Sequence, residues 1–268
     1  MKRLTDLHYW EENWWKRERP RRLWLCRDFD FETVRLLRDA GRYKERTAGT
    51  KSIRVLEAGA GGSRLLPYLG REFGYKVFGS DFSLNGCRLL RANLALQRVE
   101  GGVVCEDLFV SSLSADTFDL VYSSGLVEHF DETRVVLAEH LRLLKPGGQL
   151  TIIVPNLQGL QGRIWKRLAP PLWSRHRVFG PQELAGFLTD LGVADVRCGY
   201  LGSFLIHIGR DPEWTMVKTW PEWLQFLAYY SVRLTNGLIS LFFRLSPLRP
   251  HSRMMSPAFY AMGTKPGK

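Results

Sequence analysis

A short apolar run that ends in a cluster of small residues restricts the fold of this chain more than any other segment. The segment is IRVLEAGAGGSRLLPYL, residues 53–69. Ile53 to Leu56 is typical of a strand buried on both faces, and the small residues at 59–62 interrupt it before a new apolar period begins. The pattern predicts a strand, a tight turn and a helix. Glycine suits such a turn because it accepts positive φ and lacks a Cβ, which lets backbone N–H groups approach a ligand.

An acidic residue follows this turn at an informative distance. Asp81 comes 20 residues after Gly61, just beyond a second predicted strand at Tyr75 to Gly79. In a doubly wound sheet, a carboxylate at this point can accept hydrogen bonds from both hydroxyls of a ribose. The two features together predict a ligand that contains a ribose. The dinucleotide fingerprint G-x-G-x-x-G fails because Arg64 occupies its last glycine position, which argues against a dehydrogenase.

The turn reads E-x-G-x-G-x-S from Glu57 to Ser63 and resembles motif I of the class I S-adenosylmethionine-dependent methyltransferases of the small-molecule type. In that family, the acidic position and the glycine turn hold the amino-acid end of S-adenosyl-L-methionine (SAM), whose ammonium suits a carboxylate. The resemblance implies SAM as the cofactor and S-adenosyl-L-homocysteine (SAH) as the product. The residues that it assigns to the cofactor are Glu57, Ala58, Gly59, Gly61, Ser63, Asp81, Phe82, Glu106, Asp107, Leu108 and Ser123.

The motifs that bind adenine and carry the reacting groups follow in the expected order. Val103 to Cys105 predicts a third strand. The resemblance implies that Asp107, or Glu106 as second choice, accepts a hydrogen bond from the adenine amino group, and that Leu108 packs beside the ring. A fourth strand and the loop with the reacting groups are expected within FDLVYSSGLVEHFDE, residues 118–132.

The remaining core elements complete the expected fold. Residues 141–156 predict a helix end, a turn at Pro146 and Gly147, and a fifth strand; Pro181 opens a helix, and a last strand covers Ala258 to Gly263. We expect an α/β fold: a Rossmann-like, doubly wound, mostly parallel sheet of seven strands. The predicted divisions are an N-terminal helical lid at 1–48, the cofactor-binding core at 49–200 and 256–268, and an aromatic and basic helical insertion at 201–255.

Methyl transfer from a sulfonium is an in-line displacement, so the protein mainly has to align the reactants. A base can add to this by deprotonating the acceptor. His129 is the predicted base because it follows the fourth strand and an ordinary histidine titrates near neutral pH. Glu128 is the second candidate, and Arg175 and His176 are further candidates on the acceptor side. The alternative is that His129 only bonds a loop or shapes the pocket.

Several acceptors are disfavoured by what the chain lacks. The loop after the fourth strand reads S-S-G-L-V-E-H, not the D/N-P-P-Y/F of enzymes that methylate exocyclic base nitrogens, and no Pro-Cys pair suggests C5 methylation of cytosine. No cluster of carboxylates with an asparagine is visible, so no metal is predicted. We expect O-methylation of a small or amphipathic acceptor. The alternatives are an RNA methyltransferase and a catalytically silent methyltransferase-fold binding module.

Two segments outside the shared core are expected to recognise the acceptor. Residues 1–46 interleave aromatic with basic side chains, and Asp30 to Arg38 predicts a helix. This composition fits a lid over the cofactor, but also stacking on nucleic acid. Residues 221–250 are apolar but interrupted by polar and charged residues, which disfavours a membrane-spanning helix. An interfacial helix, an enclosure for an apolar substrate and a structural helical subdomain all remain open.

Composition narrows the setting without identifying the acceptor. The net charge of +11 suits anionic lipid or a phosphorylated metabolite as well as nucleic acid. The four cysteines, Cys26, Cys87, Cys105 and Cys198, lie far apart and are expected to be reduced thiols. The N-terminal stretch lacks the apolar core of a signal peptide, so we expect a cytoplasmic protein, with peripheral membrane contact and oligomeric state left open.

Overall fold

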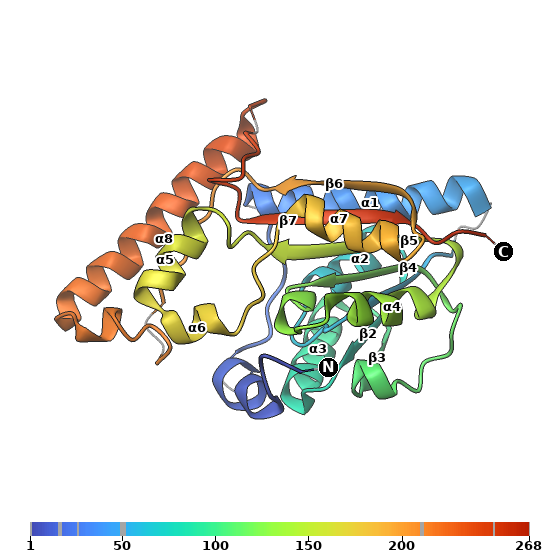
Figure 1. Cartoon of the computed structure of the whole chain (residues 1–268), viewed down its shortest axis with the longest axis horizontal. Helices are drawn as coiled ribbons and strands as arrows, with labels where there is room; N and C mark the ends of the chain where they lie inside the picture. Colours follow the sequence, from blue (N-terminus) through green and yellow to red (C-terminus); the bar gives the residue numbers. More distant parts are fainter. Residues whose placement is uncertain are drawn as a thin grey trace.

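A single seven-stranded sheet forms the centre of the molecule (Figure 1). In the computed structural model, which describes residues 2–15, 18–25, 27–48, 52–209, 212–248 and 250–267, the strand order is β3-β2-β1-β4-β5-β7-β6. β7 pairs antiparallel with β5 and β6, and the other pairs of neighbouring strands are parallel. The strands are β1 (Arg54–Ala58), β2 (Lys76–Asp81), β3 (Gly101–Cys105), β4 (Phe118–Ser124), β5 (Leu144–Pro155), β6 (Ala194–Leu201) and β7 (Ala258–Thr264). The predicted mostly parallel, Rossmann-like sheet is confirmed.

Helices cover both faces of the sheet. On one face lie α1 (Asp28–Ala48), α2 (Leu65–Phe73) and α3 (Leu84–Gln97), and on the other lie α4 (Thr133–Leu143) and α7 (Pro181–Asp190). Successive strand residues point to opposite faces. Val55 and Leu120 pack in the core under α1 to α3, while their neighbours Leu56 and Val121 pack under α4 and α7. This two-sided burial explains why the central strands read as continuous apolar runs.

Local signals in the sequence set the helix ends. Pro181 occupies the first turn of α7, as predicted. Ser83 caps α3, and its hydroxyl accepts a hydrogen bond from the backbone N–H of Gly86 at 3.0 Å. The turn predicted at Pro146 and Gly147 is displaced, because α4 ends at Leu143 and both residues lie inside β5, at an irregularity in its pairing with β4. Proline disfavours helix in the residue before it, and Gly147 has a φ of 69°.

The elements added to this core gather around the carboxyl ends of the parallel strands (Figure 1). They are the π-helical turn η1 (Tyr9–Trp14), α5 (Leu160–Leu168), α6 (Pro170–Ser174) and α8 (Glu222–Leu245), with the 3-10 turns η3 (Leu108–Val110), η4 (Val127–His129) and η5 (Val217–Thr219). The helix predicted at Asp30 to Arg38 belongs to α1, which packs on the sheet next to β4 and β5. The domain boundaries drawn from the sequence stay a prediction.

Two further expectations concern thiols and membrane crossing. Cys87, Cys105 and Cys198 are free thiols, as expected. Cys26 lies outside the described residues, as do Lys16, Arg17 and Arg249 of the two basic aromatic segments. In the part of the chain that the structure describes, no helix combines the length and the apolar character that crossing a bilayer requires.

Candidate active site

A cavity of about 480 Å³ opens at the carboxyl ends of β1, β2 and β4, a size typical of small-molecule sites. Nine of the residues assigned to the cofactor line it: Glu57, Gly59, Gly61, Ser63, Asp81, Phe82, Glu106, Asp107 and Leu108. Ala58 and Ser123 do not, because both are fully buried inside β1 and β4. Their contact with a cofactor stays a prediction. We call the half of the cavity formed by these nine residues the cofactor end.

The glycine turn after β1 has the conformation that its sequence predicts. Gly59 and Gly62 have φ values of 70° and 61°, a region that side-chain-bearing residues rarely adopt. A Cβ on Gly61 would lie 2.8 Å from the Oδ2 atom of Asp81. Gly61 instead donates its backbone N–H to that atom at 2.7 Å. The turn therefore depends on glycine for both its conformation and its close approach to Asp81.

Asp81 is held rigidly at the end of β2. Its second oxygen accepts the backbone N–H of Ser83 at 2.8 Å. Burial raises the pKa of Asp81 to about 6, although the N–H groups of Ser83 and Gly61 oppose this shift. The carboxylate is thus mostly ionised at neutral pH and can accept further hydrogen bonds from hydroxyl groups in the cavity.

Glu57 has a partner that the motif did not indicate. The Tyr122 hydroxyl, on the adjacent strand β4 and in register with Glu57, donates to the Oε2 atom at 2.7 Å. Burial raises the pKa of Glu57 to about 7, against the hydrogen bonds from Ser63 and Tyr122. A cation in the cavity would therefore favour the ionised form. The motif itself does not point to Tyr122. Its contact with Glu57 can be expected only once β1 and β4 are known to be neighbouring strands.

Glu106 and Asp107, the two acids considered for the adenine, make different contacts in the loop after β3. Glu106 accepts hydrogen bonds from Ser111 and Ser112 within its own loop. Asp107 caps η3 through the N–H of Phe109 at 3.0 Å and pairs with the guanidinium of Arg3. Burial alone would raise the pKa of Asp107, but these two contacts outweigh it and lower the pKa. Against the effect of burial, the hydrogen bonds with Ser111 and Ser112 lower the pKa of Glu106 as well, so both acids are ionised, and the choice of Asp107 over Glu106 stays a prediction.

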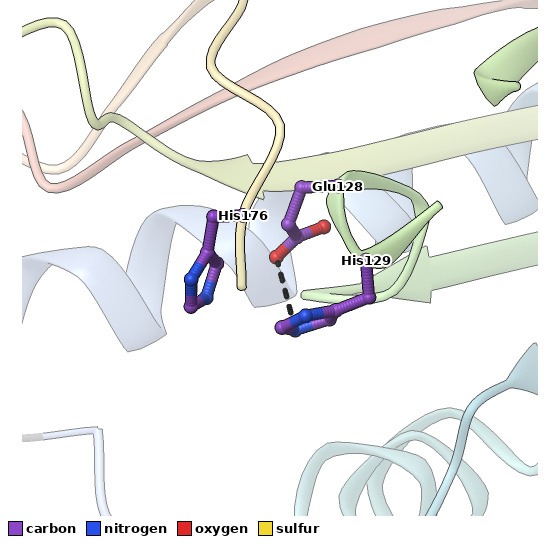
Figure 2. Close-up of side chains that lie close together, drawn as sticks. All are labelled: Glu128, His129 and His176. Atoms are coloured by element: carbon purple, nitrogen blue, oxygen red, sulfur yellow. Dashed lines mark ion pairs between the residues drawn. The ribbon is translucent and has the colours of Figure 1, made fainter. Parts of the chain in front are cut away.

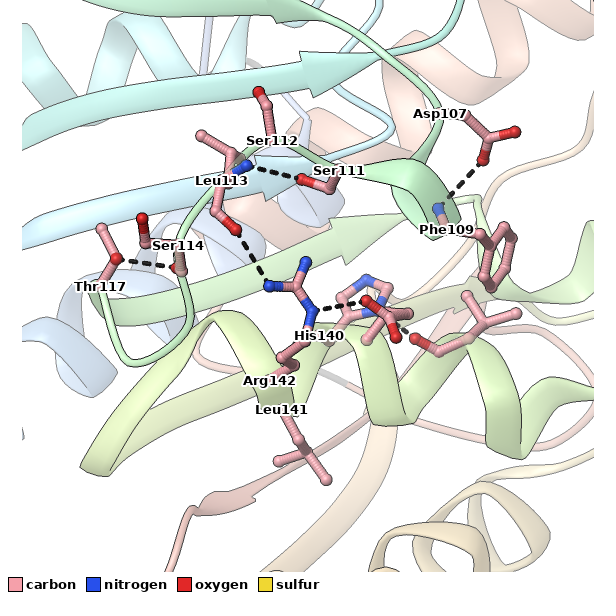
Figure 3. A network of polar contacts seen from close by, with 12 residues as sticks. Asp107, Phe109, Ser111, Ser112, Leu113, Ser114, Thr117, His140, Leu141 and Arg142 are labelled. Carbon is pink, nitrogen blue, oxygen red and sulfur yellow. Dashed lines mark hydrogen bonds and ion pairs between the residues drawn. The ribbon is translucent and has the colours of Figure 1, made fainter.

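Contacts with α4 fix the same loop from below (Figure 3). The guanidinium of Arg142 donates to the carbonyl of Leu113 at 2.9 Å and to the carboxylate of Glu139 at 2.8 Å. The hydroxyl of Ser111 accepts the N–H of Leu113 at 3.1 Å. The segment that carries Asp107 and Leu108 is therefore braced against a core helix.

The N-terminal segment lies over the glycine turn and lines the cavity. Trp15 lies against the glycine turn, since a Cβ on Gly61 or Gly62 would meet its indole at 2.9 or 2.8 Å. Trp10 stacks on Trp15 with a centroid distance of 6.2 Å and contacts the ring of His129 edge-on at 5.1 Å. These aromatic residues of the expected lid thus line both halves of the cavity.

At the far end of the cavity the structure brings together Glu128, His129 and His176 (Figure 2). The Oε1 atom of Glu128 lies 4.0 Å from Nε2 of His129, and the rings of His129 and His176 are 4.5 Å apart between centroids. One nitrogen or oxygen atom from each of the three residues falls within 4.8 Å of the others. Arg175 does not line the cavity; its guanidinium lies over the Tyr9 ring and pairs with Glu213.

Burial changes the pKa values of Glu128, His129 and His176. It raises the pKa of Glu128 to about 8. Burial also lowers the pKa of His129 to about 3, with the nearby His176 adding to the shift, and lowers the pKa of His176 to about 4. The expectation that His129 titrates near neutral pH is therefore wrong for the folded protein. At pH 7 the ligand-free cavity holds two neutral imidazoles and a protonated carboxyl group.

Large apolar side chains surround these polar groups. Trp165 from α5 lies 5.3 Å from His176 between ring centroids, and Leu172 from α6 and Tyr9 from η1 complete the wall. No pattern in the sequence pointed to α5 or α6 as parts of the site. We call the half of the cavity formed by Glu128, His129, His176 and these three residues the acceptor end.

Comparisons with known proteins find similarity to methyltransferases. The family model described as "Methyltransferase domain" matches residues 56–152. A ubiquinone biosynthesis O-methyltransferase of Coxiella burnetii is 28% identical over 109 residues, which are 41% of this chain and 46% of that protein. A tRNA U34 carboxymethyltransferase of Hydrogenovibrio crunogenus is 29% identical over 116 residues, 42% of this chain and 34% of that protein. The chain thus spans less than half the length of each of these two relatives.

A solved structure extends the likeness of fold to nearly the whole chain. The plantazolicin methyltransferase, in complex with a triazolic desmethylPZN analog and SAH, superposes with a TM-score of 0.57. The alignment covers 97% of this chain and 94% of that one at 16% sequence identity. At this identity the likeness concerns the fold alone.

Proposed function

We propose that this chain, which belongs to the class I S-adenosylmethionine-dependent methyltransferases, transfers the methyl group of SAM to a hydroxyl oxygen of a small, amphipathic acceptor. One observation carries the proposal: a single cavity joins buried, fixed carboxylates at one end to neutral polar groups with an aromatic wall at the other. The first end suits a charged nucleoside, and the second suits an uncharged acceptor.

The cofactor end offers one group for each part of SAM. In this proposal Glu57 binds the ammonium, Asp81 the ribose hydroxyls and Asp107 the adenine amino group, and all three line the cavity. Gly59 and Gly61 line the cavity and put no side chain of their own between the backbone and the amino-acid moiety. Glu57 and Asp81 are 5% and 9% exposed, so their hydrogen bonds to a ligand would be screened little by water.

The reaction needs few groups at the acceptor end. As the acceptor oxygen attacks the methyl carbon, the carbon–sulfur bond breaks and its electron pair stays on sulfur, which leaves neutral SAH. The hydroxyl proton must leave the acceptor. In this proposal Glu128 and His129, the pair predicted as catalytic, accept a hydrogen bond from the hydroxyl, and both line the acceptor end of the cavity. The wall of large apolar side chains around them favours an acceptor with an apolar body.

Helix α8 supports an acceptor that reaches the enzyme from a lipid surface. Three of its polar side chains face the protein and most of its large apolar side chains face outward, the reverse of an ordinary surface helix. Its polar residues Gln225, Asn236 and Ser240 are buried. Asn236 accepts the backbone N–H of Ile206 at 3.0 Å, and Ser240 donates to Asp28 at 2.8 Å. The outer face instead exposes large apolar side chains: Trp223, Phe226, Leu227, Tyr230, Leu234, Leu238, Leu241, Phe242 and Leu245. A face of this size on a +11 chain is typical of contact with an anionic bilayer.

Transfer of label from methyl-labelled SAM into a total cell extract tests the reaction and the acceptor class together. The extract is partitioned between organic and aqueous phases, with the Asp81→Ala protein as blank. Label in the organic phase is the expected result. Label in a nuclease-sensitive aqueous fraction would replace the proposal by an RNA acceptor, the second candidate, which the +11 charge and the likeness to a tRNA-modifying enzyme favour. Tight NAD binding in place of SAH would contradict the proposal altogether.

Sedimentation with vesicles tests the lipid surface separately. The wild-type protein should bind vesicles that contain anionic lipid, and the Leu234→Ser, Leu241→Ser double variant should bind at least tenfold less. The matched control is Leu96→Ser, an exposed leucine on α3. If the wild-type protein ignores vesicles but forms dimers that the double variant does not, α8 contacts a second copy of the chain, and the membrane proposal is refuted.

A further inference from the structure

We infer that Glu128, His129 and His176 bind a divalent transition-metal ion that holds the oxygen of the acceptor. The inference rests on the proposed function, because it assigns the ion to the acceptor end of the same cavity. It departs from the sequence analysis, which predicted no metal. The three residues come from two loops 47 positions apart in the chain, and only the fold places them side by side (Figure 2).

Both histidines are oriented as metal ligands usually are. Nδ1 of His129 lies 3.0 Å from the carbonyl oxygen of Arg175, and Nδ1 of His176 lies 2.8 Å from that of Leu172. A carbonyl accepts but cannot donate, so each Nδ1 carries the proton and each Nε2 keeps its lone pair. A backbone partner of this kind fixes the tautomer and the ring plane of metal-bound histidines.

Glu128 supplies an independent observation. Its side chain is 1% exposed, yet neither carboxyl oxygen has a hydrogen-bond partner on another of the described residues. Leaving buried polar atoms unpaired typically costs about 1–3 kcal/mol each, and such atoms usually mark an absent water or ion. One oxygen faces Nε2 of His129 at 4.0 Å. A cation between them would engage both lone pairs.

The spacing and the donor atoms define the class of ion. Metal–ligand bonds of about 2.0–2.2 Å place ligand atoms roughly 3.4–4.4 Å apart, so side-chain shifts of about 1 Å close a set that now spans 4.8 Å. Two imidazole nitrogens and one carboxylate suit zinc, cobalt or ferrous ions, whereas magnesium and calcium prefer oxygen ligands. Three protein ligands also leave a coordination position open.

The open position gives the ion its role. All three ligands line the acceptor end, so an acceptor hydroxyl can occupy the remaining position. A metal-bound hydroxyl is much more acidic than a free one, as a metal-bound water is. It loses its proton to solvent before it attacks the methyl carbon, and the bound oxygen is held in place for the displacement. No side chain then has to serve as a strong base.

Titration with Co²⁺ tests the site without any turnover, because the visible absorption of the bound ion reports its ligands. The full chain is first stripped with a chelator. We expect one equivalent of Co²⁺ to bind, without the band that a thiolate ligand gives. Glu128→Gln and His176→Gln should each weaken binding tenfold or more. The matched control is His207→Gln, because His207 also lies next to Trp165 but is outside the set of three residues.

SAH affinity, measured on every variant, separates the two proposals and reports folding. Variants that bind SAH as the wild type does but have lost Co²⁺ support the ion. Stoichiometric binding that persists in Glu128→Gln and His176→Gln, or that disappears in Cys105→Ser, would overturn it, as would no binding at all. If the wild-type protein binds Co²⁺ but not SAH, the proposed function fails while the metal site stands. A variant that binds neither ligand has unfolded, and Glu128→Asp, which keeps the carboxylate, then replaces it and should bind Co²⁺ detectably.

Discussion

The two ends of the cavity are built from the chain in different ways. The cofactor end comes from one continuous stretch, Glu57 to Leu108, in which each strand of the first half of the sheet delivers its residues in turn. The acceptor end combines the N-terminal segment, the loop after β4, and helices α5 and α6. One end is thus a property of a local motif, and the other is a property of the whole fold.

The difference explains why the donor can be assigned and the acceptor only proposed. The match to the methyltransferase domain, residues 56–152, contains the entire cofactor end. Of the acceptor end it contains only Glu128 and His129, because η1, α5, α6 and His176 lie outside it. A similarity confined to residues 56–152 therefore supports the assignment of the cofactor but not that of the substrate.

The largest effect is expected at the cofactor end. Asp81→Ala removes the carboxylate proposed to accept both ribose hydroxyls, and hydrogen bonds to charged groups contribute about 1.5–3 kcal/mol each. SAH affinity, measured by calorimetry, should fall about 100-fold or more. Asp190→Ala is the control, because Asp190 forms an exposed ion pair with Arg134 far from the cavity. If Asp81→Ala binds SAH as tightly as the wild type, Asp81 does not bind the ribose, and the cavity half that contains it is not the cofactor end.

The opposite pattern is expected at the acceptor end. His176→Gln should lower methyl transfer about tenfold or more, since the acceptor loses a group that positions it. SAH affinity should stay within about twofold, because His176 lies beyond Trp10 and His129 from the glycine turn. Single-turnover assays and SAH titrations on the same protein provide the comparison. A parallel loss of SAH binding would show that the two ends act as one.

A change of pH should affect the cofactor end with a defined sign. Burial holds the pKa of Glu57 at about 7, and a bound ammonium requires its ionised form. Below that pH the protein must release a proton to bind SAH, so affinity should drop about tenfold per pH unit, and above it affinity should level off. Tyr122→Phe removes a hydrogen bond that favours ionisation and should move the midpoint upwards. A flat profile through pH 7 would argue against Glu57 as the ammonium ligand.

The smallest effects are expected on the exposed face of α8, a helix that like most of the acceptor end lies outside the family match. Leu234→Ser and Leu241→Ser should each change the free energy of unfolding by less than about 0.5 kcal/mol, because both leucines are exposed. Asn236→Leu should cost about 1–3 kcal/mol, since it leaves the backbone groups of Ile206 unpaired. Urea denaturation measures all three. The reverse ranking would mean that the leucine face is covered in solution.

The sequence predicted the sheet and the cofactor end well, for physical reasons. Strands buried on both faces are continuous apolar runs, and a turn that needs positive φ shows as Gly59 in the motif. The acceptor end could not be predicted to the same degree. His176 was only a further candidate, because nothing local shows that its loop returns to Glu128. The pKa of His129 depends on burial, which a linear pattern does not report.

For helix α8, too, the sequence alone could not predict which side chains are buried. Its apolar residues were visible in the sequence, but a period of 3.6 does not say which face turns inward. The buried positions Gln225, Asn236 and Ser240 are the polar ones, and each has a hydrogen-bond partner: the carbonyl of Trp220 just before the helix for Gln225, Ile206 for Asn236 and Asp28 for Ser240. Hydrogen bonds to backbone groups, and not apolar burial, decided the orientation.

The N-terminal segment has a consequence for the timing of the reaction. It is tied down at one end, where the backbone of Arg3 bridges that of Phe130, and at the other, where Trp15 covers the glycine turn. A nucleoside ligand at the cofactor end would lie beneath this segment, so we expect the segment to lift once in every cycle. Lid opening commonly limits turnover. We therefore expect burst kinetics, in which the first methylated product forms faster than those that follow.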